Sequence, residues 1–153
     1  MLLKHCLVPI DFSAASDQAL AYALALATKL QAGLTLLHVI HDLPLGVGDA
    51  PSALPYPALY LQELEAEVQR GLAEHLKQVH DAGLQGDTVM VHGVPFQRIL
   101  DTARDRHIDL IIMGTHGRTG LRHVLMGSVA EKVVRLAPCP VLVTRHPDPV
   151  PQP

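Results

Sequence analysis

The sequence predicts an α/β fold, in which a five-stranded parallel sheet carries helices on both faces. Short apolar runs alternate with helix-like segments along the whole chain, a pattern typical of parallel sheets built from strand–helix–strand units. The apolar runs are continuous rather than alternating, as expected for strands buried on both faces. Right-handed crossovers then favour a doubly wound, Rossmann-like sheet with the strand order 3-2-1-4-5.

The first half of the chain contains two predicted strands and two predicted helices. The strands are the apolar runs at residues 6–10 and 34–40, and the second is rich in residues that favour strands. Ser13 or Ser16 caps the helix between them, and Gly33 ends it. Residues 41–57 form a long loop rich in proline and glycine, which we expect to be functional or mobile. The next helix buries residues spaced by three and four, namely Leu61, Leu64, Val68, Leu72, Leu76 and Val79.

The second half of the chain adds three strands, at residues 88–92, 109–113 and 140–144. Pro95 opens the helix after the first of them, in a turn where its missing N–H costs nothing. The buried face of this helix is predicted to be Phe96, Ile99, Leu100 and Ala103. The last helix begins at Gly127-Ser128, and its inward residues are predicted to be Ala130, Val133, Val134 and Ala137.

Composition indicates one folded domain. Of the 153 residues, 48% are hydrophobic and 18% charged, which is enough apolar surface for a core. The net charge of −3, without a basic run, argues against nucleic-acid binding. The apolar start is too short for a secretory signal, and no stretch approaches a membrane span. We therefore expect a cytoplasmic protein in which Cys6 and Cys139 are buried free thiols.

The predicted topology locates a ligand site before any motif is considered. In a doubly wound sheet, ligands bind beyond the carboxyl ends of the strands where the winding direction reverses. With the order 3-2-1-4-5, that place lies between the first and fourth strands. The residues just past those strand ends are Asp11 and Gly114.

The segment after the fourth strand has the features of an anion site. Gly114 and Gly117 allow a ligand to approach the main chain closely. Gly127-Ser128 stands at a helix start, where N–H groups point outward and the helix dipole is positive. Between residues 114 and 130 there is no acidic residue, and four side chains that can carry positive charge are present: His116, Arg118, Arg122 and His123.

Other interpretations of these residues remain open. Ser128 and Glu131 also fit a capping box, in which each satisfies a backbone N–H of the other. Asp11 can be a turn residue before Ser13 rather than a ligand contact. A P-loop and the dinucleotide-binding fingerprint are both excluded by the glycine spacing. The ten histidines lack the spacing of a zinc site, so no metal ligands are expected. They are expected instead at strand or helix ends, as for His38, His92 and His107, or on the solvated or rim side of the second helix, as for His75 and His80.

The motif resembles that of a known family. Gly114-x-x-Gly117, nine residues, then Gly127-Ser128 is similar to the ATP-binding motif of the universal stress protein family. Residues 8–13, Val-Pro-Ile-Asp-Phe-Ser, resemble the family's opening strand and turn, and residues 140–143, Pro-Val-Leu-Val, resemble its closing strand. The likeness runs from residue 3 to about residue 145. It implies an adenine nucleotide alpha hydrolase-like fold, with a universal stress protein domain at residues 1–146 and a flexible, proline-rich tail at 147–153.

The resemblance also implies a ligand and a set of contacts. ATP, with or without Mg²⁺, would bind with Asp11 at the ribose or the adenine edge and with the main chain of Val39 at adenine. Met113 and Gly114 would line the ribose. The N–H groups from the glycine-rich segment would hold the phosphates, beside His116 and Arg118. The implied contact residues are Pro9, Asp11, Val39, Met113, Gly114, His116, Gly117, Arg118, Gly127, Ser128, Val129 and Ala130.

Two classes of function follow from these expectations. The first is a nucleotide-sensing module of the stress response, a homodimer joined through the strand from Pro140 to Thr144, with protein partners that the sequence does not identify. The second is a slow ATPase or phosphotransferase on the same site. Phosphoryl transfer commonly needs a lysine and metal-binding carboxylates, and the segment has arginines but neither of these. We therefore expect binding, with at most weak hydrolysis. An AMP-preferring or flavoprotein-like relative is a third alternative.

Overall fold

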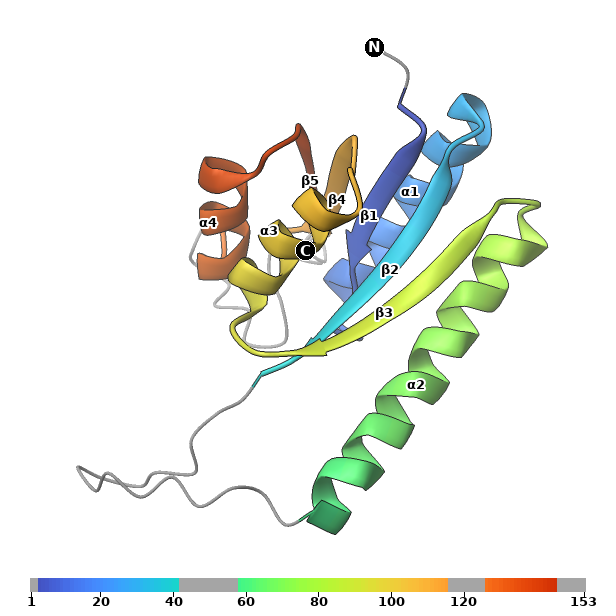
Figure 1. Cartoon of the computed structure of the whole chain (residues 1–153). Coiled ribbons are helices and arrows are strands. Elements are labelled where there is room, and N and C mark those ends of the chain that lie inside the picture. Colours follow the sequence, from blue (N-terminus) through green and yellow to red (C-terminus); the bar gives the residue numbers. More distant parts are fainter. Residues whose placement is uncertain (1–2, 42–57, 116–125, 146–153) are drawn as a thin grey trace, which may run out of the picture.

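The computed structural model describes residues 3–41, 58–115 and 126–145. In chain order the elements are β1 (His5–Pro9), α1 (Ala14–Leu30), β2 (Gly33–Ile40), α2 (Ala58–Asp81), β3 (Gly86–His92), α3 (Pro95–Asp105), β4 (Leu110–Gly114), α4 (Ser128–Leu136) and β5 (Val141–Thr144). The strands pair in parallel in the order β3-β2-β1-β4-β5. The predicted fold class and strand order are confirmed (Figure 1).

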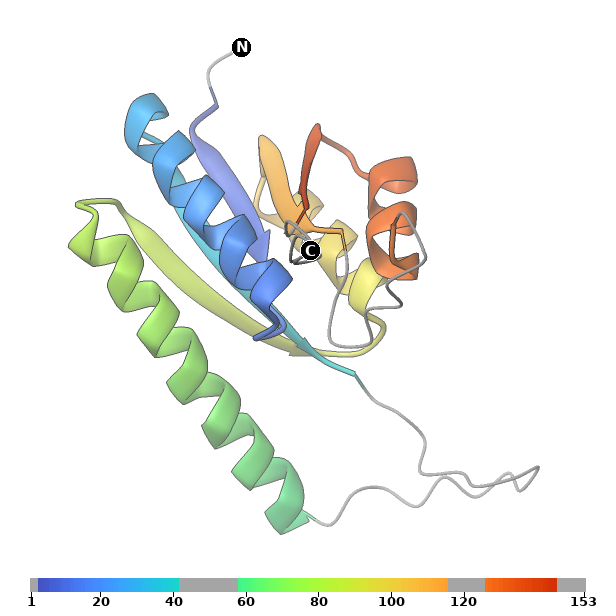
Figure 2. The ribbon, with the colours of Figure 1, turned by 180° about the vertical axis from the view of Figure 1, so that it is seen from behind.

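The sheet separates two apolar cores. One core lies under α1 and α2 and includes Leu20 and Leu72, and the other lies under α3 and α4 and includes Ile99 and Val133. Figures 1 and 2 show the sheet from its two faces, with α1 in front in the second view. Because both faces are covered, most residues of the central strands are buried, as in β1, where Cys6 to Val8 are fully buried.

The edge strands depart from this pattern. In β3 and β5 most residues are only partly buried or are exposed, because each edge strand has a neighbour on one side only.

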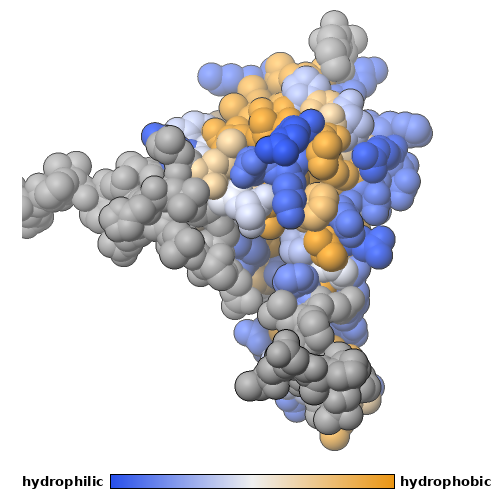
Figure 3. All heavy atoms as spheres, turned by 90° about the vertical axis from the view of Figure 1, so that its left-hand side faces the viewer, coloured by the Kyte–Doolittle hydropathy of each residue, from blue (hydrophilic) through white to orange (hydrophobic). Residues whose placement is uncertain are grey.

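Val134 of α4 also faces outward, with 45% of its surface exposed, so the prediction that it points inward is wrong. Figure 3 views the molecule from the left-hand side of Figure 1 and shows apolar and polar residues interleaved there.

The ends of α1 show how local chemistry sets the helix. Ser13 is the N-cap, and its hydroxyl accepts a hydrogen bond from the N–H of Ser16 at 3.2 Å. The first of the two predicted caps is therefore confirmed. The helix ends at Leu30, and its C-cap, Gln31, adopts a left-handed conformation with φ of 54°. Gly33 instead begins β2, so the prediction that it ends the helix is wrong. No helix in the described ranges combines the length and apolarity needed to cross a bilayer.

The two cysteines lie in different cores and are free thiols. Cys6 is fully buried, and burial raises the pKa of its thiol to about 11, whereas Cys139 is only half-buried. We expect a thiol reagent at pH 8 to modify Cys139 first and Cys6 only after unfolding, because a protonated, buried thiol is not a nucleophile. Rapid labelling of Cys6 in the native protein, located by peptide mass spectrometry, would contradict this placement.

The raised pKa of Cys6 also predicts a loss of stability at alkaline pH. An exposed cysteine thiol has a pKa of 9.0, whereas the Cys6 thiol in the fold has a pKa of about 11. Between these two values the native state keeps a proton that the unfolded chain releases. The contribution of the Cys6 thiol to the free energy of unfolding is therefore complete below pH 9 and is lost as the pH rises towards 11. The urea midpoint of the wild type should fall more steeply between pH 8.5 and pH 10.5, roughly the window that the two values define, than that of Cys6→Ala.

Candidate functional site

A pocket of about 460 Å³ lies at the carboxyl ends of the central strands. It is the switch point between β1 and β4 that the topology predicts. Nine of the twelve residues predicted to contact a ligand line it: Pro9, Asp11, Val39, Met113, Gly114, Gly127, Ser128, Val129 and Ala130. The other three, His116, Gly117 and Arg118, lie outside the described residues.

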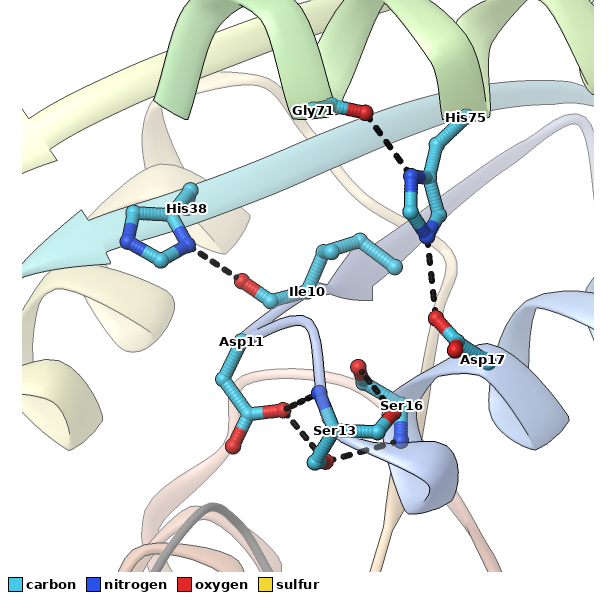
Figure 4. Close-up of polar contacts among 8 residues, drawn as sticks. All are labelled: Ile10, Asp11, Ser13, Ser16, Asp17, His38, Gly71 and His75. Carbon is cyan, nitrogen blue, oxygen red and sulfur yellow. Dashed lines mark hydrogen bonds and ion pairs between the residues drawn. The ribbon is translucent and has the colours of Figure 1, made fainter. Parts of the chain in front are cut away.

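The turn from β1 into α1 places Asp11 at this pocket. One carboxylate oxygen, Oδ1, accepts hydrogen bonds from the N–H of Ser13 at 3.0 Å and from its hydroxyl at 2.5 Å. The Asp11 side chain therefore has the turn role that the sequence left open. It also lines the pocket, so the turn role and a ligand contact are compatible. Figure 4 shows the second carboxylate oxygen on the side away from Ser13.

The start of α4 forms the opposite wall, and its N-cap is Gly127, which carries no side-chain cap. Ser128 is the first helical residue rather than the cap, and the Glu131 carboxylate pairs with Arg135 at 2.6 Å. The capping-box interpretation of Ser128 and Glu131 is therefore wrong. The first N–H groups of a helix have no partner within the helix, and here they belong to Ser128, Val129 and Ala130, which all line the pocket.

Gly127 has a different role from the one its position in the motif implies. Its N–H donates to the carbonyl of Thr115 at 2.7 Å, so the expectation that this N–H holds a phosphate is corrected. The N–H of Thr115 in turn donates to the carbonyl of Thr144 at 2.9 Å. This pair of backbone bonds holds the helix start against β4 and β5. What Gly127 provides to the pocket is the absence of a side chain beside three helical N–H groups.

Several lining residues were not predicted from the sequence. Tyr60 and Leu64 come from the first turns of α2, whose fourth-residue spacing puts them on one face. That spacing was visible in the sequence, but nothing local indicated that the helix start reaches the ligand end of the sheet. The remaining additions come from strand ends and from α1 and α3: Ile10, Ser16, Leu37, His38, Ile40, His41, Pro95, Ile99 and Thr115.

The described carboxylates are distributed unevenly between the two ends of the sheet. Asp11 is the one carboxylate among the described residues that line it. The carboxyl groups with resolved pKa shifts lie at the opposite end of the sheet. N–H groups of Lys4 and His5 donate to Asp109 and hold the pKa of its carboxyl below the usual range. Burial opposes ionisation of Asp87, but hydrogen bonds from Thr35 and Arg106 prevail and lower its pKa.

Histidine is a common metal ligand in proteins, and the chain contains ten histidines. Across residues 3–41, 58–115 and 126–145, no three His, Cys, Asp or Glu side chains are grouped so that they could hold a metal ion. His38 and His92 lie near strand ends as expected. His75 was expected on the solvated or rim side of its helix, but its side chain is 15% exposed and contacts Asp17 of α1 at 2.9 Å. That expectation is wrong.

Comparison with known proteins identifies the family. The chain matches the universal stress protein family over residues 3–145. Universal stress protein YxiE of Bacillus subtilis is 34% identical over 148 residues, which cover 94% of this chain and 100% of that protein. Universal stress protein MJ0531 of Methanocaldococcus jannaschii is 36% identical over 146 residues, which cover 95% of this chain and 84% of that protein.

Solved structures agree with the sequence matches. Universal stress protein UspA from Lactobacillus plantarum superposes with a TM-score of 0.77 at 30% identity, covering 95% of this chain and 99% of that one. Hypothetical protein MJ0577 superposes with a TM-score of 0.73 at 30% identity, covering 97% and 100%. The strand order, the pocket at the switch point and these matches lead to one conclusion: the chain belongs to the universal stress protein family.

Proposed function

We propose that this protein binds ATP in the pocket between β1 and β4 and works as a nucleotide-sensing module in the cytoplasm. The observation that carries the proposal is the start of α4, which has no side-chain cap and where Ser128, Val129 and Ala130 line the same pocket as Asp11. Helix N–H groups and the positive end of the helix dipole bind phosphate oxygens. A carboxylate opposite them suits hydroxyl groups rather than phosphate. A ligand with phosphate at one end and hydroxyls farther along matches this order.

The walls of the pocket suit a flat base. Pro9, Val39 and Met113 supply apolar surface from three adjacent strands, and Tyr60 and Leu64 supply more from α2. Backbone groups at the end of β2, near Val39, would read the edge of adenine. Two solved structures with this fold hold adenine nucleotides, one cAMP and the other dAMP. They are 20% and 21% identical to this chain, so they support only the capacity of the fold for such ligands.

A slow ATPase or phosphotransferase is the alternative on the same site. Such chemistry needs a positioned nucleophile and strong neutralisation of charge on the transferred phosphoryl group. Among the described lining residues, no lysine or arginine is present and Asp11 is the single carboxylate. Mg²⁺ carried in by the phosphates would keep several waters and would need few ligands from the protein. This composition favours binding, with at most weak hydrolysis.

The proposal includes a homodimer joined through β5. The strand is at the edge of the sheet, and Leu142 in it is 39% exposed. An open edge strand is a template for pairing with a second chain. Residues 1–146 would form the folded unit, and residues 147–153 would be dispensable for it. Light scattering that gives the mass of one chain would contradict the dimer.

The test of the proposed function is to identify the ligand and measure its affinity. Mass spectrometry should detect an adenine nucleotide among the ligands released from freshly purified protein. Calorimetry on the stripped protein should give micromolar-scale dissociation constants for ATP, which correspond to roughly 8 kcal/mol, and weaker binding of GTP. Tighter binding of AMP than of ATP would favour an AMP-preferring module. Multiple-turnover phosphate release would favour the enzyme. No binding of any adenine nucleotide would contradict the proposal.

A further inference from the structure

The residue after Asp11 has an unusual backbone. Phe12 adopts φ of 62°, in the left-handed region, which is unfavourable for a side chain with a Cβ. It joins the end of β1 to Ser13, the N-cap of α1. Such conformations persist only when the surrounding structure over-determines them, and they gather at functional sites. The contacts of the Phe12 ring therefore need an explanation.

Two histidines hold the ring from different elements. The imidazole of His38, from β2, stacks on it with centroids 4.9 Å apart and planes inclined by 25°. The imidazole of His75, from α2, meets it edge-on at 5.6 Å and 67°. Both geometries are favourable for aromatic pairs. We call Phe12, His38 and His75 the aromatic clamp.

Both histidines of the clamp are themselves fixed by hydrogen bonds (Figure 4). Nδ1 of His38 lies 2.7 Å from the carbonyl oxygen of Ile10. Nδ1 of His75 lies 2.8 Å from the carbonyl oxygen of Gly71, and its Nε2 lies 2.9 Å from Oδ1 of Asp17. Each partner belongs to a different segment, so the clamp ties β1, β2, α1 and α2 together at the turn.

The helix α2 is shaped to admit the Phe12 ring. A Cβ on Gly71 would lie 2.6 Å from Cε1 of Phe12 and 2.9 Å from its Cζ, well inside the contact distance of carbon atoms. Phe12 itself does not line the pocket, whereas its neighbours Ile10, Asp11 and His38 do. The Phe12 ring therefore contacts the pocket indirectly, through neighbours that line it.

We infer that Phe12 is a positioning residue that sets the Asp11 carboxylate against the ribose hydroxyls of the bound nucleotide. The inference rests on the proposed function. The backbone of Phe12 links Asp11 to Ser13 in the turn after β1. In this turn the N–H of Ser13 donates to the Asp11 carboxylate at 3.0 Å, and the Ser13 hydroxyl donates to it at 2.5 Å. A ring held on three sides prevents the turn from relaxing out of the left-handed conformation. Asp11 is thereby placed before the ligand arrives, which reduces the entropy cost of binding.

The test compares ATP with 2′,3′-dideoxy-ATP, which lacks the hydroxyls that Asp11 would bind. A site built to bind a hydroxyl rejects the analogue that lacks it, and a charge-assisted hydrogen bond contributes roughly tenfold or more in affinity. The wild type should therefore prefer ATP by about that factor. In Phe12→Leu, which keeps apolar volume but not the flat ring, we expect this preference to fall below about threefold, with dideoxy-ATP binding changed less than about twofold.

Two further variants separate positioning from folding. Gly71→Ala places a methyl group of α2 against the Phe12 ring and leaves the sequence of the turn unchanged. This variant should also lower the preference for ATP over dideoxy-ATP. Phe96→Leu is the control, because Phe96 is the other phenylalanine of the chain and lies on the opposite face of the sheet. Its ring contacts Nζ of Lys132, 4.7 Å from the ring centroid, and its loss should leave the preference for ATP unchanged. In an Asp11→Asn background, Phe12→Leu should have no additional effect on it.

The outcomes distinguish this inference from the proposed function. A wild type that binds neither nucleotide would contradict both. A wild type that binds ATP and its dideoxy analogue equally would leave nucleotide binding standing and remove the role of Asp11, and with it that of Phe12. If the wild type prefers ATP and Phe12→Leu weakens both ligands by the same factor, Phe12 is merely structural and the inference is overturned.

Discussion

A Gly127→Val variant is expected to lose ATP binding by at least about a hundredfold while keeping its fold. The backbone of Gly127, with φ of −70° and ψ of 157°, is extended and open to valine, so the change causes no backbone strain. Its isopropyl group would stand at the N-cap beside the N–H groups of Ser128, Val129 and Ala130, where the phosphates are proposed to lie. A factor of a hundred corresponds to about 2.7 kcal/mol of binding free energy.

Calorimetry with ATP measures the effect, and circular dichroism with thermal melting shows whether the fold persists. Gly33→Val is the matched control, because a Cβ there would lie 3.6 Å from the nearest atom, the carbonyl oxygen of Gln85, at an ordinary contact distance. Gly33 begins β2, at the other end of the sheet from the pocket. Equal affinity of the wild type and the Gly127 variant for ATP would exclude the start of α4 as the phosphate site.

A Gly114→Val variant is expected to lower the free energy of unfolding by about 1–3 kcal/mol, the usual cost of overpacking. A Cβ on Gly114 would lie 2.9 Å from both the Cβ and the carbonyl oxygen of Ala15, and 3.0 Å from its carbonyl carbon. Two of these atoms are backbone in the first turn of α1, which cannot move without shifting the helix. Gly114 therefore allows the close approach of α1 to the end of β4.

Urea unfolding of Gly114→Val, with Gly33→Val as the control again, measures this cost. A Gly114 variant as stable as the control would show that the start of α1 can shift freely. The same change should also weaken ATP binding, because Gly114 and Asp11 line one pocket and Ser13, the partner of Asp11, caps the helix that is pushed away. Ligand loss here accompanies a loss of stability, whereas in Gly127→Val it does not.

Much of the fold was predictable because its determinants are local. Continuous apolar runs, Ser13 before a helix and Pro95 in the first turn of another are each read from a few neighbouring residues, and each agrees with the structure. Right-handed crossovers favour a doubly wound sheet for a chain of alternating strands and helices, and the predicted order 3-2-1-4-5 is the Rossmann-like form of such a sheet. That order placed Asp11 and Gly114 at one pocket without any knowledge of side-chain contacts.

Three of the errors, at His75, Val134 and Ser128, share a physical cause, which is that they concern partners distant in the chain. His75 has a polar side chain on a helix, and only the position of α1 against α2 turned it inward to Asp17. Val134 fits the helical period, but the side of α4 that is buried carries Ala130 and Val133, and the Val134 side chain beside them remains exposed. The cap interpretation of Ser128 was locally sound, and it failed because Thr115 fixes Gly127 one residue earlier.

The sequence by itself therefore determined the element order, the parallel sheet, the family resemblance and the segments that meet at the pocket, because periodicity and glycine spacing are properties of neighbouring residues. The tertiary structure decided that the N–H of Gly127 bonds to Thr115, that Tyr60 and Leu64 line the pocket, and that the aromatic clamp contacts the turn at Phe12. These depend on distances between elements, and packing alone sets such distances.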